Sequence, residues 1–215
     1  MFHQMLVSWF NFVRDWGYVG VFVLMAIESS VVPIPSEVVM APAAFWAAQG
    51  KMDFWLVVLA GTVGSYAGSL VSYVVSRAVG APVVARYGKY FLVPEKKLLL
   101  AEAWITRYGV AGIFFSRLLP VVRHLISIPA GILKMNIVRF SAATTLGAGL
   151  WCTILSWWGV KVIGDRPDLL DSPETLVAVC RDKLQWFVGA VIVLAAAYAL
   201  VMYVKRKQAT PVNAL

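Results

Sequence analysis

Three stretches of the sequence run for more than twenty residues without a charged side chain: Phe54–Ser76, Phe140–Val160 and Leu184–Val204. An α-helix of about 20 apolar residues crosses the roughly 30 Å of hydrocarbon in a bilayer. The composition agrees, because 60% of the residues are hydrophobic and 14% are charged, against about 45–50% and about 25% in an ordinary soluble domain. These values exclude a soluble enzyme, a secreted disulfide scaffold and a disordered tail. The sequence predicts a helical integral membrane protein.

The charges outside these runs predict which side of the membrane each segment occupies. The last run ends in Lys205-Arg206-Lys207, and basic residues next to a span favour the cytoplasm. Counting membrane crossings back from this cytoplasmic end places residues 164–183 outside and residues 77–107 inside. The outer segment has five acidic and three basic residues, whereas the inner one has six basic and two acidic residues. The net charge of +8 therefore reflects cytoplasmic loops and anionic lipid headgroups, and we expect no nucleic-acid partner.

Two further apolar stretches, residues 16–49 and 108–133, are interrupted by prolines and ionisable side chains. Proline removes a backbone donor and breaks a helix, and irregular backbone at membrane depth persists only where protein or a wet cavity surrounds it. We therefore expect each stretch to be a re-entrant hairpin, two half-helices that meet at a break, with two kinked full spans as the alternative. The break residues are Pro33, Pro35, Pro120 and Pro129.

The two halves of the chain resemble each other. A shift of 83 residues aligns Lys51-Met52-Asp53 with Lys134-Met135-Asn136, and it also aligns Gly64 with Gly147. Upstream, with a gap, the pattern Gly-x-x-Gly-x-Phe at Gly17 recurs at Gly109. One full crossing and one hairpin separate the two Lys-Met turns, so the turns should face opposite sides of the membrane. This predicts inverted repeats, which are common in secondary transporters.

The predicted fold is all-α, with inverted repeats that each consist of a re-entrant hairpin and a transmembrane helix, followed by a C-terminal transmembrane helix. The first residues carry Phe10 and Val13 on the apolar face of a helix that should lie in the membrane interface. The expected segments are an amphipathic helix at 1–15, the first repeat at 16–76 (hairpin 16–49, span 54–76), a cytoplasmic amphipathic connector at 77–107, the second repeat at 108–163 (hairpin 108–133, span 140–160), an external loop at 164–183, a span at 184–204 and a cytoplasmic tail at 205–215.

The hairpins also carry the ionisable groups expected at membrane depth, Glu28 and Glu37 in the first and Arg117 and Arg123 in the second. Each such charge costs about 2.5–3.5 kcal/mol at a helix centre, so the charges must be compensated. Two buried salt bridges between the hairpins are one explanation. We favour a cavity for polar cargo, because replacing a buried ion pair by apolar residues is often no less stable.

These residue types suggest what the cargo is. The guanidinium fork binds phosphate through two hydrogen bonds and stays charged, so we expect Arg117 and Arg123 to hold a phosphate. Ser36 is a good N-cap for the second half-helix, whose first N–H groups would also face an anion. A carboxylic acid in an apolar pocket can carry a proton in neutral form. We therefore assign proton coupling to Glu28 and Glu37, with Glu28 as the expected carrier.

Other features are less specific. His124 could relay protons or could simply be hydrogen-bonded. Gly64-x-x-x-Gly68 could serve the fold or a homo-oligomer. We expect no enzyme, no cofactor and no metal, because the chain has only two histidines, its cysteines lack metal-ligand spacing, and Asp53 is its one aspartate between residues 16 and 164. The predicted interfacial anchors are Trp151, Trp157, Trp158 and Trp186.

Three motifs resemble those of one membrane-protein family. Residues 28–37 (ESSVVPIPSE) resemble the first re-entrant motif of the DedA family, also called the SNARE-associated or VTT-domain family. Residues 115–123 (FSRLLPVVR), running on to Pro129-Ala130-Gly131, resemble its second motif, and residues 72–80 resemble the stretch between them. The likeness covers about residues 17–163.

The resemblance implies two opposed re-entrant hairpins and, for bacterial members, recycling of a polyprenyl-phosphate lipid carrier. The Pro-x-Pro-Ser-Glu form is most similar to the undecaprenyl-phosphate translocase branch, although other branches commonly have Pro-Gly-Asp where Glu37 stands. We therefore expect a multi-pass flippase for undecaprenyl phosphate in the bacterial cytoplasmic (inner) membrane, driven by a proton or sodium gradient and supporting cell-envelope synthesis. Eukaryotic relatives are phospholipid scramblases. A scramblase, or a membrane-homeostasis or assembly factor without coupled transport, is the alternative.

Overall fold

The computed structural model describes residues 2–30, 36–87, 95–119 and 122–163. The predictions for residues 164–183, 184–204 and 205–215 lie outside the described residues, as do those for Pro33, Pro35 and Pro120. Within the described residues the secondary structure is helical, without strands. The helices are α1 (Phe2–Ser30), α2 (Ser36–Ala48), α3 (Phe54–Tyr87), α4 (Glu95–Arg117), α5 (Ser127–Ile132) and α6 (Ile137–Ile163).

Three of the described helical segments are long and apolar enough to cross a membrane: Ser8–Ser30, Phe54–Gly80 and Ile137–Lys161. The last two contain the predicted spans 54–76 and 140–160, which are confirmed as continuous helices. The first was not predicted as a single span. It joins the N-terminal helix to the first part of the hairpin, with a non-helical residue, Gly17, between them.

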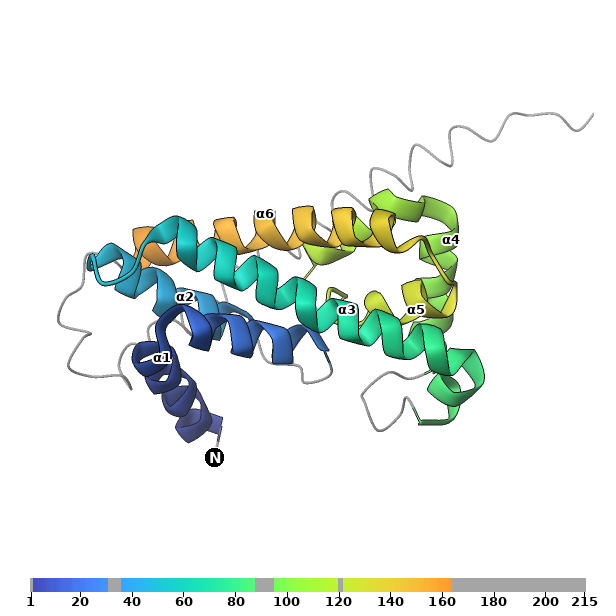
Figure 1. The fold of residues 1–215 in the computed structure, drawn as a ribbon, viewed down its shortest axis with the longest axis horizontal. Helices are drawn as coiled ribbons and strands as arrows, with labels where there is room; N and C mark the ends of the chain where they lie inside the picture. The colour runs from blue at the N-terminus through green and yellow to red at the C-terminus, as the bar shows by residue number, and fades with distance from the viewer. Residues whose placement is uncertain (1, 31–35, 88–94, 120–121, 164–215) are drawn as a thin grey trace, which may run out of the picture.

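The long helices α3 and α6 lie side by side and run in opposite directions (Figure 1). In this view α1 and α2 lie toward one end of the pair, where α3 begins, and α4 and α5 lie toward the other. One group of buried apolar side chains surrounds α1 and α2, and a second surrounds α5 and the start of α6. The two predicted hairpins therefore approach each other from opposite ends of the α3–α6 pair.

Glycines bring several of these helices into close contact. A Cβ atom at Gly64 or Gly68 would overlap the backbone of α1 at Phe22 or Ala26. The Gly64-x-x-x-Gly68 pattern therefore serves packing within the fold. The other close contacts are Gly131 of α5 against α3, Gly147 of α6 against Arg117 of α4, and Gly159 of α6 against Ala44 of α2.

The positions aligned by the internal repeat have matching local geometry. Gly17 and Gly109 each interrupt a helix with φ 53° and ψ −129°, a conformation that a residue with a side chain rarely adopts. Asp53 accepts backbone N–H groups at the start of α3 through Oδ1. Asn136 does the same at the start of α6. These likenesses support the repeat alignment, while the opposite orientation of the two halves stays a prediction.

The N-terminal part of α1 packs on the protein. Phe10 and Val13, which were predicted to face the membrane interface, are buried. The Phe10 ring lies 5.7 Å from that of Trp46 on α2. The apolar face of this helix therefore contributes to the core around the first hairpin.

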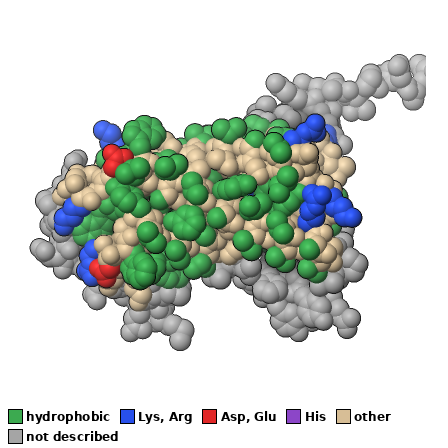
Figure 2. Space-filling view, in the orientation of Figure 1, with side chains coloured by type: hydrophobic (Ala, Val, Ile, Leu, Met, Phe, Trp, Pro, Cys, Tyr) green, Lys and Arg blue, Asp and Glu red, His purple; other side chains and the backbone are tan. Residues whose placement is uncertain are grey.

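Across the surface drawn in Figure 2, hydrophobic side chains cover the middle of the molecule, and the charged side chains lie at its two ends. Leu59 and Val63 of α3 and Leu146 of α6 are among the exposed large apolar residues. A surface of this kind suits a protein surrounded by lipid, because an apolar band between polar ends matches the layers of a bilayer.

Candidate functional site

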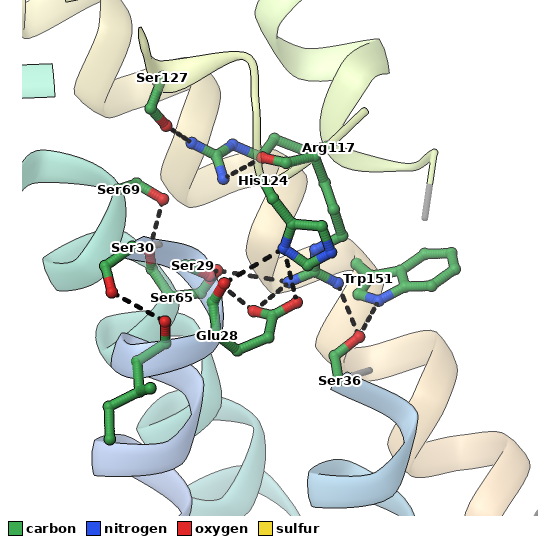
Figure 3. Close-up of polar contacts among 12 residues, drawn as sticks. Glu28, Ser29, Ser30, Ser36, Ser65, Ser69, Arg117, His124, Ser127 and Trp151 are labelled. Carbon is green, nitrogen blue, oxygen red and sulfur yellow. Dashed lines mark hydrogen bonds and ion pairs between the residues drawn. The ribbon is translucent and has the colours of Figure 1, made fainter. Parts of the chain in front are cut away.

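The two predicted hairpins meet at a buried cluster of polar side chains (Figure 3). Glu28 comes from the end of α1, Ser36 is the first residue of α2, and Arg123 lies in the turn between α4 and α5. The exposed fractions of Glu28 and Arg123 are 0% and 1%. Residues 95 positions apart in sequence thus form an ion pair in the interior of the protein.

Arg123 is the centre of the cluster. Its Nη2 atom lies 3.3 Å from Oε2 of Glu28 and its Nη1 donates to Oγ of Ser36 at 3.0 Å. The guanidinium carbon lies 5.6 Å from the centroid of the Trp151 ring, a cation–π distance. The indole N–H of Trp151 donates to the same Ser36 hydroxyl at 3.1 Å. The guanidinium is therefore fixed on three sides, by a carboxylate, a hydroxyl and an aromatic face.

The two carboxylate oxygens of Glu28 have different partners. Oε2 accepts the hydroxyl of Ser29 at 2.7 Å in addition to Arg123. The Ser29 hydroxyl lies 2.7 Å from that of Ser65 on α3. Oε1 lies 3.3 Å from Nδ1 of His124. The carboxylate therefore joins both hairpins and α3.

Arg117 ends α4 and is as deeply buried as Arg123. It donates to the backbone oxygen of Arg123 at 2.9 Å and to the hydroxyl of Ser127 at 2.7 Å. Among the described residues, no carboxylate lies within salt-bridge distance of Arg117. Of the two buried salt bridges considered as an alternative, the described residues contain one, that of Glu28 with Arg123.

Each arginine has one donor without a hydrogen-bond partner among the described residues. The Nε atoms of Arg117 and Arg123 are buried and make no hydrogen bond to the described residues. Buried polar atoms in proteins are nearly always hydrogen-bonded, so each exception needs an explanation. Two free guanidinium donors at one buried cluster are able to bind the oxygens of an anion.

Glu37 follows Ser36 in the first turn of α2 and is almost completely buried. It is close enough to Arg123 and Glu28 to interact with both electrostatically. The cluster thus contains two arginines and two glutamates, and it is neutral when all four are ionised. Every residue predicted from the sequence for phosphate or proton binding is at or next to this cluster: Arg117, Arg123, Ser36, Glu28 and Glu37. Of the predicted break prolines, Pro129 is the one among the described residues, and its prediction was wrong, because it lies inside α5 (Ser127–Ile132), where it is buried.

The prediction for Trp151 was wrong. It was expected to anchor the protein at the membrane interface, but it is 2% exposed and contacts Arg123 and Ser36. Trp157, in contrast, is 58% exposed. A signal was present in the sequence, because Trp151 stands at the middle of an uncharged run whereas anchoring tryptophans lie at the ends. Trp186 is outside the described residues.

Sequence reasoning also missed the serines of α3. Ser65 contacts the cluster directly, and Ser69, Ser72 and Ser76 continue the same buried face. Their spacing of four, three and four residues is the helical repeat that places side chains on one face. The helix was read only as an apolar span, so this polar face was overlooked. Among the described residues there is no group of three or more His, Cys, Asp or Glu side chains that could hold a metal ion.

Comparison with known proteins gives the family. The model of the VTT domain matches residues 34–161, more than half of the chain. The chain belongs to the VTT-domain (DedA) family. The resemblance found in the sequence motifs is thereby confirmed. The matched region contains Ser36, Glu37, Arg117 and Arg123, whereas Glu28 precedes it.

Several relatives of this VTT-domain protein match over most of its length. "Undecaprenyl phosphate transporter A" of Bacillus subtilis (strain 168) is 32% identical over 157 residues, 73% of this chain and 76% of the relative. The protein of the same name from Staphylococcus aureus (strain NCTC 8325 / PS 47) is 28% identical over 203 residues, 92% and 96% of the two chains. The "Alkaline phosphatase-like protein" of Lactococcus lactis subsp. lactis (strain IL1403) is 33% identical over 204 residues, 91% and 90%. No solved structure matches.

Proposed function

We propose that this protein moves undecaprenyl phosphate, a polyprenyl phosphate, between the leaflets of the bacterial cytoplasmic membrane, and that proton uptake accompanies this movement. The observation that carries the proposal is the buried Arg123–Glu28 pair beside Ser36, where the two hairpins meet. Two relatives named undecaprenyl phosphate transporter A, one of them similar over nearly the whole chain, support the same substrate.

In this proposal the carboxylate of Glu28 occupies the place that a phosphate takes on Arg123. Carboxylate and phosphate oxygens both accept hydrogen bonds from a guanidinium in the same plane. Ser36 already accepts from Arg123, and its own hydroxyl hydrogen can turn toward a phosphate oxygen. Ser36 also opens α2, and backbone N–H groups at a helix N-terminus attract anions. The free Nε atoms of both arginines add two further donors.

Charge balance is the reason for expecting proton coupling. The four ionised groups of the cluster sum to zero, and an incoming phosphate would leave it negative. Unbalanced charge in the interior of a protein costs several kcal/mol. A proton taken up by Glu28 cancels one negative charge, releases Arg123 from its partner and removes the repulsion between carboxylate and phosphate. Loss of that proton on the other side restores the ion pair and expels the lipid. Glu37, near the same charges, is the second acid of this cycle.

Arg117 supports the phosphate site in two ways. Its bond to the backbone oxygen of Arg123 fixes the turn that carries Arg123, and its bond to Ser127 connects that turn to α5. Its free Nε points to a direct contact with phosphate as well. We expect loss of Arg117 to weaken binding through both effects.

The proposed topology places this site within reach of both leaflets. The hairpins approach from opposite ends of the α3–α6 pair (Figure 1), as expected of two inverted repeats with re-entrant hairpins. Residues 77–107 and the C-terminal tail would be cytoplasmic, and Lys51 would face outward. A lipid phosphate could then reach Arg123 from either side while its polyprenyl chain stays among lipid tails.

The experiment uses liposomes with labelled undecaprenyl phosphate in one leaflet, and it measures exchange between leaflets with and without an imposed pH gradient. We expect the gradient to change the rate in the native protein. Arg123→Lys keeps the charge but loses the fork, and should weaken binding by about 1–3 kcal/mol. Glu28→Gln resembles the protonated state, so exchange should continue without responding to the gradient. Arg139→Lys, at an exposed arginine of α6, is the matched control.

The same assay separates the other functions. Exchange that ignores the gradient in the native protein indicates a scramblase, and no exchange at all indicates a homeostasis or assembly factor. Release of inorganic phosphate from the lipid would indicate an enzyme. This release should be measured because the Lactococcus relative is named an alkaline phosphatase-like protein. Normal lipid binding by a folded Arg123→Lys protein would remove Arg123 from the phosphate site.

A further inference from the structure

One member of the buried cluster reaches the surface. The side chains of Glu28 and Arg123 are 0% and 2% exposed, whereas that of His124 is 20% exposed. We propose that His124 is the residue through which Glu28 exchanges its proton with the surroundings of the protein. This inference rests on the proposed function, in which Glu28 takes up a proton when the phosphate binds.

The geometry connects His124 with the one oxygen of Glu28 that can accept a proton. Oε2 is occupied by Ser29 and Arg123, but Oε1 makes no hydrogen bond to the described residues. Nδ1 of His124 lies 3.3 Å from Oε1, and it also lies 3.2 Å from the backbone oxygen of Glu28. The other ring nitrogen, Nε2, makes no hydrogen bond to a described residue. One nitrogen therefore faces the acid, and the other is free for a water molecule.

The charges around His124 favour transfer of a proton from its imidazole to Glu28 over a stably protonated imidazole. Glu28 on α1 attracts a protonated imidazole, while Arg123 from the same turn and Arg117 on α4 repel it. A third positive charge next to two buried arginines is costly in a medium of low dielectric constant. In this inference the imidazolium is therefore an intermediate that passes its proton to Glu28 rather than a stable charged state.

The proton balance is simple. Nε2 takes a proton from a hydronium ion, which leaves a water molecule, and Nδ1 gives its own proton to Oε1 of Glu28. The imidazole ends neutral with the proton on Nε2, and rotation of the ring or return of a proton resets it. The carboxyl group ends neutral and releases Arg123 for the phosphate. The reverse sequence removes the proton from Glu28 when the lipid leaves, so that the carboxylate is negatively charged again.

A merely structural role is the competing explanation, since His124 also connects the two hairpins through the backbone oxygen of Glu28. Two variants separate the roles. His124→Asn places an amide donor near the position of Nδ1 but cannot exchange a proton. His124→Ala leaves space that free imidazole can fill. His3→Ala, at the other histidine of the chain, is the control.

The measurement is gradient-driven exchange of undecaprenyl phosphate in liposomes, together with equilibrium binding of the same lipid. We expect both His124 variants to bind the lipid as the native protein does and to lower the gradient-driven rate by on the order of tenfold or more. Added imidazole should restore the rate of His124→Ala, should not restore that of His124→Asn, and should leave His3→Ala at the native rate throughout.

Three results would overturn the inference. Native rates in both His124 variants show that no proton passes through this residue. Weakened lipid binding in His124→Ala that His124→Asn restores shows a structural role instead. A slow His124→Ala protein that imidazole fails to accelerate also contradicts the exchange role. If the native protein shows no gradient-driven exchange, the proposed function fails and this inference fails with it. If the native protein is active and the His124 variants exchange lipid at the same gradient-driven rate, this inference alone is contradicted.

Discussion

Two glycines that lie two residues apart in α6, Gly147 and Gly149, allow a matched test of how the second predicted hairpin positions Arg117. A Cβ atom at Gly147 would lie 2.7 Å from Cβ of Arg117 and 3.1 Å from the backbone oxygen of Phe114. A Cβ atom at Gly149 would lie 3.6 Å from the nearest atom, Cγ2 of Thr62, which is ordinary contact. Gly147→Ala and Gly149→Ala thus make the same chemical change in one helix, but only the first meets an obstacle.

The expected magnitude follows from these distances. Ordinary contact begins at 3.4 Å, so α4 must move by about 0.7 Å to accept an alanine at position 147. Overpacking of this kind costs about 1–3 kcal/mol, partly offset by the roughly 1 kcal/mol that alanine gains over glycine in a helix. Gly149→Ala should show the gain alone. The two variants should therefore differ by about 1–3 kcal/mol in stability, or about 2–4 °C in Tm per kcal/mol for a chain of this size.

The same movement should reach the site. Arg117 donates to the backbone oxygen of Arg123 at 2.9 Å and to Ser127 at 2.7 Å, and a displacement of about 0.7 Å takes both contacts to the limit of a hydrogen bond. We expect Gly147→Ala to weaken lipid binding and Gly149→Ala to leave it unchanged. Thermal unfolding in detergent and binding of undecaprenyl phosphate measure the two effects. A Gly147→Ala protein as stable and as active in binding as Gly149→Ala would refute the reasoning.

Two other predictions address the topology and the aromatic face. Single cysteines that replace Lys51 and Lys134, in a protein without its native cysteines, should react with a membrane-impermeant reagent from opposite sides of the membrane. Equal reaction of both cysteines from the same side would contradict the inverted repeats. Trp151→Phe keeps an aromatic face for Arg123 but loses the N–H that binds Ser36, so lipid binding should weaken by about 0.5–1.5 kcal/mol. An unchanged dissociation constant for the lipid would show that this hydrogen bond does not position the site.

The sequence identified the features that depend on local physics. An uncharged run long enough for a bilayer must be a helix, so α3 and α6 were predicted from residues 54–76 and 140–160. Asp53 and Asn136 are short polar side chains that precede a helix, and both accept backbone N–H groups there. The charged residues of the hairpins were recognised because their cost in lipid demands a reason.

The partners of those charges could not be predicted. Nothing in the spacing of Glu28, Glu37, Arg117 and Arg123 shows that Arg123 pairs with Glu28 while Arg117 binds a backbone oxygen and Ser127, since both pairings depend on how the hairpins pack. The burial of Trp151 was missed for a related reason. A helix that is apolar on all sides has no hydrophobic stripe to show which face meets protein and which meets lipid.

The close glycine contacts divide the molecule in an unexpected way. Gly68 fixes α1 on α3, and Gly131 fixes α5 on α3. Gly147 and Gly159 fix α4 and α2 on α6. These contacts define two groups of helices, the α3 body (α1, α3 and α5) and the α6 body (α2, α4 and α6), so the two arms of each predicted hairpin are held by different bodies. Gly61 of α3, close to Met40 of α2 and Cys152 of α6, is a contact between the bodies.

This division runs through the polar cluster. Glu28 belongs to the α3 body, whereas Ser36 and Trp151 belong to the α6 body. Arg123 is in contact with residues of both. In the proposed cycle, a proton on Glu28 would therefore weaken the charged contact between Glu28 and Arg123 that joins the two bodies. In the proposed function, a lipid headgroup would pass along the boundary between the two bodies.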